Sequence, residues 1–268
     1  MEEIRPTLLR FLFTGLGLYV AILVGLYFGQ EKLLFFPEKL DRDFEFHFGP
    51  NTKEFFIPSG DIELHALGFE VENPKGLLFY FHGNAGSLAS WGHVALQFAQ
   101  SNYNIYVLDY RGYGKSGGKI TSETQLQRDA ETFHNFFRAR YPKLDTVIFG
   151  RSIGTGIASW LATVHAPKKL ILETPYFNLP DLATSIYPFV PKALVRYKLR
   201  NDHWLAKVKC PVHLIHGTRD ALIPVEASHR LSKINSKFSL HIIKDGGHNN
   251  LSDFADYRTT LQKIFLDQ

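Results

Sequence analysis

The stretch TVIFGRSIGTG, residues 146–156, joins an apolar run to the pattern Gly-x-Ser-x-Gly and leads into an apolar segment typical of a helix. A serine hydroxyl is a poor nucleophile in water. It becomes useful where a sharp strand-to-helix turn holds it next to a base and to backbone N–H groups. The glycines at 150 and 154 suit such a turn, because it is strained and neighbouring chains pass close to it. The alternative is a glycine-rich helix entry with a capping serine, and residues elsewhere in the chain separate the two interpretations.

The length and composition of the chain limit its class. The 268 residues suit one large α/β domain or two small ones. Hydrophobic residues make up 45% of the chain, which is enough for an extensive core. The net charge of +4 is too small to indicate a nucleic-acid partner. Cys210 is the single cysteine, so an intramolecular disulfide and a cysteine-rich metal cluster are excluded.

The N-terminal segment, from about residue 8 to residue 29, is the most hydrophobic part of the chain. Residues 11–29 carry no charge, and this length is about what a helix needs to cross the hydrocarbon core. A cleaved signal peptide and a buried core helix are the alternatives, but the residues before Gly29 form a poor cleavage site. We interpret residues 1–30 as a single-pass transmembrane anchor and residues 31–268 as the domain behind it. Basic residues flank the segment almost equally, so the side of the membrane that carries the domain stays open.

The rest of the chain predicts an α/β fold. Apolar and polar residues alternate at 44–48 and in parts of 54–57 and 62–71, which is typical of antiparallel edge strands. From Gly76 onward, short apolar strands alternate with helices, which predicts a mostly parallel sheet covered on both faces. We expect strands at 77–81, 104–108, 146–149, 170–172, 212–215 and 240–243, and helices at about 88–100 and 122–140, between the later strands and after residue 252.

One segment interrupts this alternation. Residues 175–209 contain four prolines and many aromatic residues, and we interpret them as a small lid inserted between two strands. An apolar lid indicates an acyl-chain substrate, whereas a satellite core under a loop is the ordinary alternative. Residues 192–209 carry six basic side chains and one acidic one, so this part could rest on anionic headgroups or form a solvated face.

Three other patterns do not fit a cofactor or metal site. Residues 112–117 read Gly-x-Gly-x-x-Gly, but a dinucleotide site needs a helix that begins at once and an acidic residue after the next strand. A phosphate-binding loop would need glycine at position 109, which is Asp. His213 and His216 lie three apart on a strand and face opposite sides, so no metal site is expected.

A serine nucleophile needs a base, and the base needs an acid that orients it. Such residues should lie at the carboxyl ends of strands, where an open parallel sheet builds its sites. Asp220 follows the strand 212–215 and His248 follows the strand 240–243, in the chain order Ser, Asp, His known from α/β-hydrolases. Glu173, after its own strand, is the alternative acid. His82 is interpreted as structural.

The sequence resembles the α/β-hydrolase-fold serine hydrolases, specifically a membrane-anchored branch of small esterases and acyl-thioesterases with a short lid. The resemblance covers about residues 77–268 and is carried by FHGNAGS at 81–87, DYRGYGKSGG at 109–118, GRSIGTG at 150–156, HGTRDALIP at 216–224 and GGHNN at 246–250. It implies Ser152 as nucleophile, His248 as general base and acid, and Asp220 as orienting carboxylate. It also implies an oxyanion hole from the backbone N–H groups of Asn84 and Ile153, and no cofactor.

These residues predict hydrolysis of a carboxylic ester or thioester through an acyl-enzyme on Ser152. The expected partner is a small-molecule or lipid acyl substrate at a membrane, and the oligomeric state is not encoded. A serine peptidase of the same fold and a catalytically inactive, membrane-anchored binding protein are the alternatives. The candidate substrate-binding residues are Tyr176, Phe177, Tyr187, Phe189 and Ile223.

Overall fold

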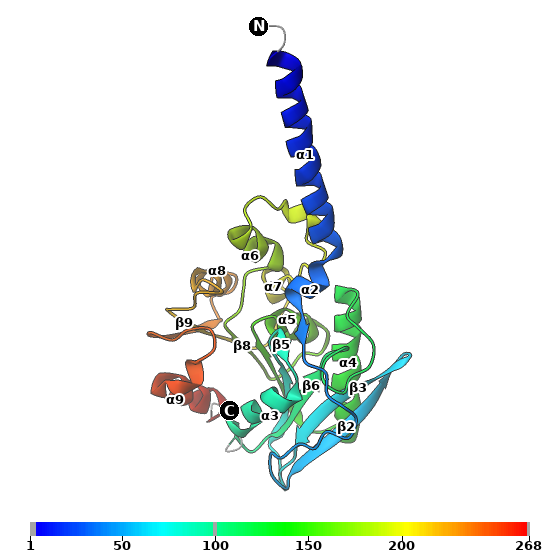
Figure 1. The fold of residues 1–268 in the computed structure, drawn as a ribbon. Helices are drawn as coiled ribbons and strands as arrows, with labels where there is room; N and C mark the ends of the chain where they lie inside the picture. Colours follow the sequence, from blue (N-terminus) through cyan, green and yellow to red (C-terminus); the bar gives the residue numbers. More distant parts are fainter. Residues whose placement is uncertain (1–3, 99–100, 267–268) are drawn as a thin grey trace.

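A central sheet with helices on both faces forms the body of the protein, and a long N-terminal helix projects from it (Figure 1). The computed structural model describes residues 4–98 and 101–266. In this part of the chain the large sheet has eight strands in the order β10-β9-β8-β7-β4-β6-β3-β2. The strands β2 (Thr52–Ser59) and β3 (Ile62–Phe69) are antiparallel, and β3 pairs antiparallel with β6. The predicted mostly parallel sheet with an antiparallel N-terminal edge is confirmed.

Six strands pair in parallel at the centre and far edge of this sheet. All residues of three of them, β4, β6 and β8, are buried, as expected for continuous apolar runs covered on both sides. Each strand expected downstream of Gly76 lies within an observed one. The six are β4 (Gly76–Phe81), β6 (Asn104–Asp109), β7 (Asp145–Arg151), β8 (Lys169–Glu173), β9 (Val212–Gly217) and β10 (Ser239–Ile243).

The helices bury one apolar stripe each against the sheet. One hydrophobic cluster includes residues of α4, α5 and α8, and the other includes residues of α3 and α9, so the two groups cover opposite faces. The side chain of Ser122 accepts a hydrogen bond from the backbone N–H of Gln125 at 3.2 Å, and this cap starts α4 where the sequence predicts it. The bounds are α3 (Leu88–Leu96), α4 (Glu123–Arg140), α5 (Gly154–Val164), α8 (Glu226–Ser232) and α9 (Ala255–Leu266).

Two sequence-based predictions of elements need correction. The helix expected at 88–100 ends at Leu96, and residues 99–100 lie outside the described residues. Residues 44–48 form no strand. Their alternation comes from aromatic rings that pack on the domain, since Phe46 stacks on His65 at 5.4 Å and Phe48 meets His93 at 4.8 Å. Ring burial with a period of two thus imitates a strand although the backbone has no pairing partner there.

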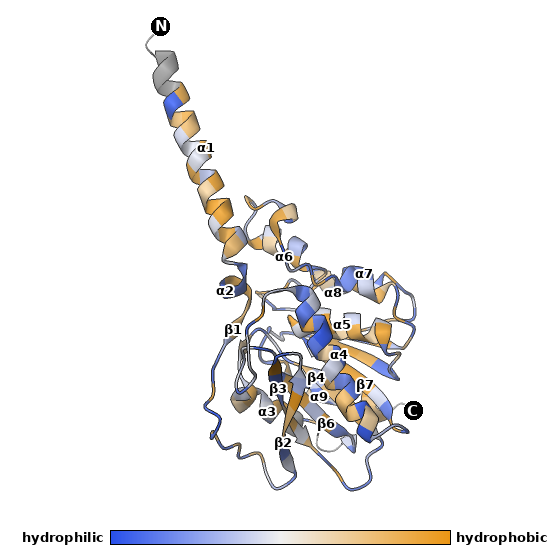
Figure 2. Cartoon of the chain, turned by 90° about the vertical axis from the view of Figure 1, so that its right-hand side faces the viewer, coloured by the Kyte–Doolittle hydropathy of each residue, from blue (hydrophilic) through white to orange (hydrophobic). Residues whose placement is uncertain are grey.

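Between β8 and β9 the chain leaves the sheet and forms three short helices. We call residues 175–209 the lid segment. It lies beside the lower part of α1 in both views (Figures 1 and 2). Its helices are α6 (Leu179–Ile186), the 3-10 helix η2 (Lys192–Leu194) and α7 (Asn201–Leu205).

The projecting helix α1 (Ile4–Phe28) is apolar along most of its length (Figure 2). Its stretch Leu9–Phe28 has a mean hydropathy of 2.1 and is long and apolar enough to cross a membrane. None of this stretch is buried inside the protein, which excludes the alternative of a core helix. A short helix, α2 (Gln30–Leu34), and the two-residue strand β1 (Phe36–Pro37) then join α1 to the domain.

Candidate active site

Ser152 lies at the turn between β7 and α5. Its φ of +53° is in the left-handed region, which residues with a side chain rarely adopt. The backbone on both sides holds this strained conformation, because the Ser152 N–H donates to the Glu173 carbonyl at 2.9 Å and the Ser152 carbonyl accepts from the Thr155 N–H at 3.0 Å. The predicted strand–turn–helix context of the Gly-x-Ser-x-Gly pattern is therefore present.

The two glycines of the pattern are required by close packing. A Cβ added to Gly150 would lie 2.6 Å from the Gly154 carbonyl oxygen and 2.7 Å from the Cβ of Ala158. A Cβ added to Gly154 would overlap the carbonyl oxygen of Phe81, at the end of the central strand β4. Both neighbours are backbone or rigid side-chain atoms, so they cannot move aside cheaply.

We expect Gly154→Ala to lower the free energy of unfolding by about 3 kcal/mol, because the added methyl group must push β4 and α5 apart. Val164→Ala, at the exposed end of the same helix, should change it by only about 0.5 kcal/mol. Thermal unfolding of the full chain in detergent, followed by circular dichroism, measures both. Equal melting temperatures for the two variants would contradict the close packing described here.

His248 and Asp220 meet Ser152 at the carboxyl end of the sheet. His248 follows β10, and its Nε2 lies 3.1 Å from the Ser152 Oγ. Its Nδ1 lies 2.7 Å from the Oδ2 of Asp220, which follows β9. The three side chains that the sequence analysis selected are thus brought together, although 96 residues separate Ser152 from His248.

The hydrogen bonds fix the tautomer of His248. An ionised Asp220 can only accept, so the Nδ1 of His248 carries the hydrogen and its Nε2 is free to accept the Ser152 proton. Backbone N–H groups of Leu222 and Ile223 donate to the other oxygen of Asp220 at 2.9 and 2.8 Å. Burial opposes ionisation of this fully buried carboxyl, but the contacts with His216, His248 and the Ile223 N–H hold the pKa of Asp220 below its usual value.

Glu173, the alternative acid, faces other partners. One of its oxygens pairs with the Nε of Arg151 at 3.1 Å, and the other accepts from the Tyr257 hydroxyl at 2.6 Å. Arg151 also donates to the carbonyl oxygen of His248 at 3.2 Å, so it ties the histidine loop to the nucleophile turn. The sequence analysis missed this role. The signal that could have pointed to it is the charge of Arg151 inside the nucleophile motif, where burial requires a partner of opposite charge. Glu173 is that partner, since the two residues lie opposite each other in the β7–β8 pairing.

The two residues expected to form the oxyanion hole flank Ser152. Ile153 directly precedes α5, where unpaired N–H groups and the helix dipole favour negative charge. Asn84 lies in the loop after β4, and a Cβ added to its neighbour Gly83 would be 3.9 Å from the Cβ of Ser152. The carbonyl of Asn84 accepts from the Phe36 N–H at 2.8 Å and from the Tyr113 hydroxyl at 2.7 Å, which fixes the orientation of this loop.

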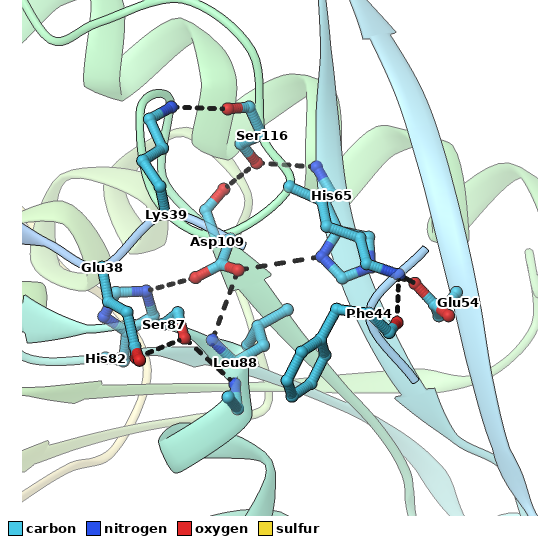
Figure 3. A network of polar contacts seen from close by, with 12 residues as sticks. Glu38, Lys39, Phe44, Glu54, His65, His82, Ser87, Leu88, Asp109 and Ser116 are labelled. Carbon is cyan, nitrogen blue, oxygen red and sulfur yellow. Dashed lines mark hydrogen bonds and ion pairs between the residues drawn. The ribbon is translucent and has the colours of Figure 1, made fainter. Parts of the chain in front are cut away.

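A buried polar network supports the loop that carries Asn84 (Figure 3). Asp109, fully buried at the end of β6, lies 3.6 Å from the Nε2 of His82 and 3.7 Å from the Nδ1 of His65. The ring of His82 stacks against Trp91 with centroids 5.4 Å apart, and its Nδ1 donates to the Gly83 carbonyl at 2.7 Å. His82 is therefore packed into the loop rather than directed at Ser152.

This network predicts an acid-sensitive stability. Burial raises the pKa of Asp109, but His65 and His82 outweigh it and hold the pKa below the ordinary value of about 3.9. The folded state therefore binds this proton less readily than the unfolded state, so the ionised carboxyl stabilises the fold above about pH 3.9 and the contribution is lost as the pH falls further.

We expect the melting temperature of the wild type to fall more steeply between about pH 5 and pH 3 than that of Asp109→Asn. Asp43→Asn, which changes an exposed carboxyl, should follow the wild type. Thermal unfolding at several pH values measures the slopes, and identical slopes for all three proteins would count against the role of Asp109.

A cavity of about 360 Å³ opens beside these residues, between the lid segment and the end of α1. Its lining includes Asn84 and also Leu222, whose backbone N–H donates to Asp220. Of the five predicted substrate-binding residues, the cavity lining includes Tyr187 and not the others. Two of them support the fold instead. Tyr176 is buried with its hydroxyl 3.3 Å from the Ile153 carbonyl, and Ile223 is buried behind Asp220.

The other two predicted substrate-binding residues also have partners outside the cavity lining. Arg230 lies over the ring of Phe177 at 3.6 Å, and Phe189 is half exposed at the tip of the lid segment. What the sequence analysis missed is the opposite wall of the cavity, which α1 and α2 supply. No feature of the sequence marks this wall, because the apolar end of a helix can face either lipid or protein.

The described residues contain no group of three or more His, Cys, Asp or Glu side chains that could hold a metal ion. Burial raises the pKa of the Cys210 thiol to about 11, so this group is not a thiolate at neutral pH. The hydroxyl of Ser152, the imidazole of His248 and the carboxylate of Asp220 form a hydrogen-bonded series. Such a series can activate an alcohol for attack on a carbonyl group.

Comparison with known proteins gives the same fold. A family model described as "Serine aminopeptidase, S33" matches residues 72–203. An uncharacterized protein of Acanthamoeba polyphaga mimivirus is 30% identical over 245 residues, covering 81% of this chain and 82% of that protein. The lysophosphatidylserine lipase ABHD12 of Danio rerio is 29% identical over 192 residues, 64% of this chain, and the chain spans about half of its length.

Among solved structures, an esterase of Pyrococcus furiosus superposes with a TM-score of 0.69 at 19% identity, covering 87% of this chain and 96% of that one. At this identity the likeness concerns the fold. Together, the sheet order, the strand–turn–helix around Ser152 and these relatives establish that the chain belongs to the α/β-hydrolase family.

Proposed function

We propose that this protein is a serine hydrolase that cleaves carboxylic esters or thioesters of acyl chains at a membrane. The observation that carries the proposal is the hydrogen-bonded series from the Ser152 Oγ through His248 to Asp220, with separations of 3.1 and 2.7 Å. Residues 1–30 would act as its single-pass anchor and residues 31–268 as its catalytic domain.

In the first half of the reaction, the Ser152 Oγ attacks the carbonyl carbon of the substrate while its proton passes to the Nε2 of His248. The negative charge that develops on the carbonyl oxygen is stabilised by the backbone N–H groups of Asn84 and Ile153, about 3 kcal/mol for each donor. Asp220 stabilises the imidazolium that forms. His248 then gives the proton to the leaving oxygen or sulfur, the bond to the leaving group breaks, and Ser152 is acylated.

In the second half, a water molecule loses a proton to His248 and attacks the acyl carbon. The bond to the Ser152 Oγ breaks and the serine regains its proton from His248, which releases the acid. No step needs a metal or an organic cofactor, since every proton moves between groups of this chain, substrate and water.

The cavity favours an acyl substrate over a peptide. An enzyme that removes N-terminal residues needs a carboxylate to hold the α-ammonium group, and none of the described residues that line the cavity is acidic. The lining side chains are almost all apolar, as suits a fatty chain. The relative from Danio rerio, a lysophosphatidylserine lipase by name, acts on a single-chain lipid and supports the same substrate class.

A panel of acyl esters, acyl thioesters and aminoacyl amides of graded chain length tests this proposal on the full chain in detergent. We expect turnover of esters or thioesters that rises with chain length, and turnover of aminoacyl amides that does not exceed the blank of Ser152→Ala. Preferred cleavage of the amides would support the peptidase alternative, and no turnover of any member would support a binding protein.

A further inference from the structure

The cavity beside the catalytic residues has one wall from the N-terminal helix. Leu23, Leu26 and Tyr27 lie on one face of α1, at the spacing of successive helical turns, and line the cavity. Leu182 and Ile186 of α6 line the facing wall. The helix that looks like a simple anchor therefore contributes to the place where an acyl chain would lie.

Hydrogen bonds hold α1 and α2 against the lid segment. The side chain of Gln30 donates to the Leu194 carbonyl at 2.8 Å and accepts from the Arg196 N–H at 2.8 Å. Higher on the helix, the Tyr19 hydroxyl donates to the carbonyl of Phe189 at 2.8 Å. The lid segment is thus tied to the N-terminal helices at two levels, by α2 at Leu194 and Arg196 and by α1 at Phe189.

The upper tie sets the position of the lid tip along the apolar stretch of α1. Tyr19 lies near the middle of the apolar stretch Leu9–Phe28, and the nine residues from it to Phe28 span about 14 Å of helix. With this stretch in a hydrocarbon core of about 30 Å, the Phe189 carbonyl would lie roughly halfway across it. A backbone carbonyl in lipid needs a donor within the protein, and the Tyr19 hydroxyl supplies it.

The exposed side chains of the lid tip also suit lipid. Ile186, Tyr187 and Phe189 are each about half exposed, and they gather next to the apolar face of α1. Outside a membrane they would present unfavourable apolar surface to water. The cavity lining joins two of these residues, Ile186 and Tyr187, to Asn84 and Leu222 beside the catalytic residues.

We propose that the acyl chain of a membrane-resident, single-chain lipid ester passes sideways from the leaflet, between α1 and α6, to Ser152. This inference rests on the proposed function and names the substrate class and its entry route. The volume of about 360 Å³ corresponds to roughly twelve groups of about 30 Å³ each, fewer than the carbons of one palmitoyl chain, so a second chain would not fit. The substrate never has to leave the bilayer completely, which avoids the cost of exposing its chain to water.

The direct test uses the full chain in phosphatidylcholine vesicles and a fluorophosphonate whose 16-carbon chain carries a diazirine near its far end. The Ser152 Oγ displaces fluoride, and irradiation then crosslinks the chain to its neighbours. We expect crosslinks at Leu23, Leu26 or Tyr27 of α1. Crosslinks confined to residues outside α1 and α6, with Ser152 modified, would overturn the entry route alone. Failure of the probe to react with Ser152 would overturn the proposed function as well.

A kinetic test uses two tryptophan substitutions on the same turn of α1. Leu26→Trp fills the cavity, whereas Val24→Trp places the same side chain on an exposed face of the helix. We expect the ratio of kcat/KM for a palmitoyl ester in vesicles to that for p-nitrophenyl acetate to fall at least about tenfold in Leu26→Trp and to stay at the wild-type value in Val24→Trp. Equal ratios for the two variants would overturn the proposal, because a ratio is insensitive to a loss of folded protein.

Discussion

Replacing Ser152 with alanine is expected to lower kcat for an acyl ester by about 10⁶-fold, because the remaining groups of a triad cannot activate water in its place. The change removes one oxygen from a side chain whose backbone, held by Glu173 and Thr155, keeps its conformation. The melting temperature should therefore stay close to that of the wild type. Steady-state turnover per mole of folded protein, with the folded fraction taken from thermal unfolding, measures the loss.

The matched control is Ser159→Ala, on the helix α5 that follows Ser152. Ser159 is buried and its hydroxyl donates to the Asn201 side chain at 2.7 Å, so its removal should lower the stability by about 1 kcal/mol without lowering kcat more than a few-fold. A large fall in kcat for both variants would mean that disturbance of α5, rather than loss of a nucleophile, explains the effect of Ser152→Ala.

Asp220→Asn is expected to lower kcat by about 10⁴-fold, since an amide no longer holds the His248 tautomer in which Nε2 can accept a proton. The same change in the alternative acid, Glu173→Gln, should act mainly on stability, because Glu173 pairs with Arg151 and Tyr257 rather than with the histidine. Turnover and thermal unfolding of the two variants, measured side by side, separate the roles. A greater loss of kcat in Glu173→Gln than in Asp220→Asn would assign the orienting acid to Glu173.

The sequence predicts much of the sheet because its parallel strands are short, continuous apolar runs between turn residues. It predicts that Asp220 and His248 lie near Ser152 because parallel strands all end at the same edge of a sheet. It fails at residues 44–48, where aromatic rings spaced two apart pack on His65 and His93 without any strand pairing. Rings that pack from an irregular segment and side chains of a paired strand can both repeat every second residue. The sequence pattern alone therefore does not distinguish the two.

The residues that line the cavity are harder to predict from the sequence than the catalytic residues. Tyr176 and Ile223 are apolar residues near the motif, yet their tertiary contacts place them in the core behind Ser152 and Asp220. The facing wall comes from residues more than 120 positions upstream of Ser152, at Leu23 and Leu26. Only the packing of α1 against the lid segment brings this wall to the site, and that packing depends on pairs such as Gln30 with Leu194 and Arg196.

Six basic residues lie at 192–209, but the structure leaves less free charge there than the sequence indicates. Lys192 pairs with Asp181, Arg196 with Glu31, and Arg200 with Asp202. A pair of opposite charges attracts an anionic headgroup much less than an isolated cation does. The apolar lid tip, rather than this basic stretch, is therefore the main contact that we expect with the membrane.

One measurement tests the central claim most directly: locating the site of reaction of an alkyl fluorophosphonate with the full-length protein by peptide mass spectrometry. The account predicts a single adduct on the peptide that contains Ser152, absent after Ser152→Ala and strongly slowed in Asp220→Asn. An adduct on a different residue, or a folded wild-type protein that does not react at all, would contradict it.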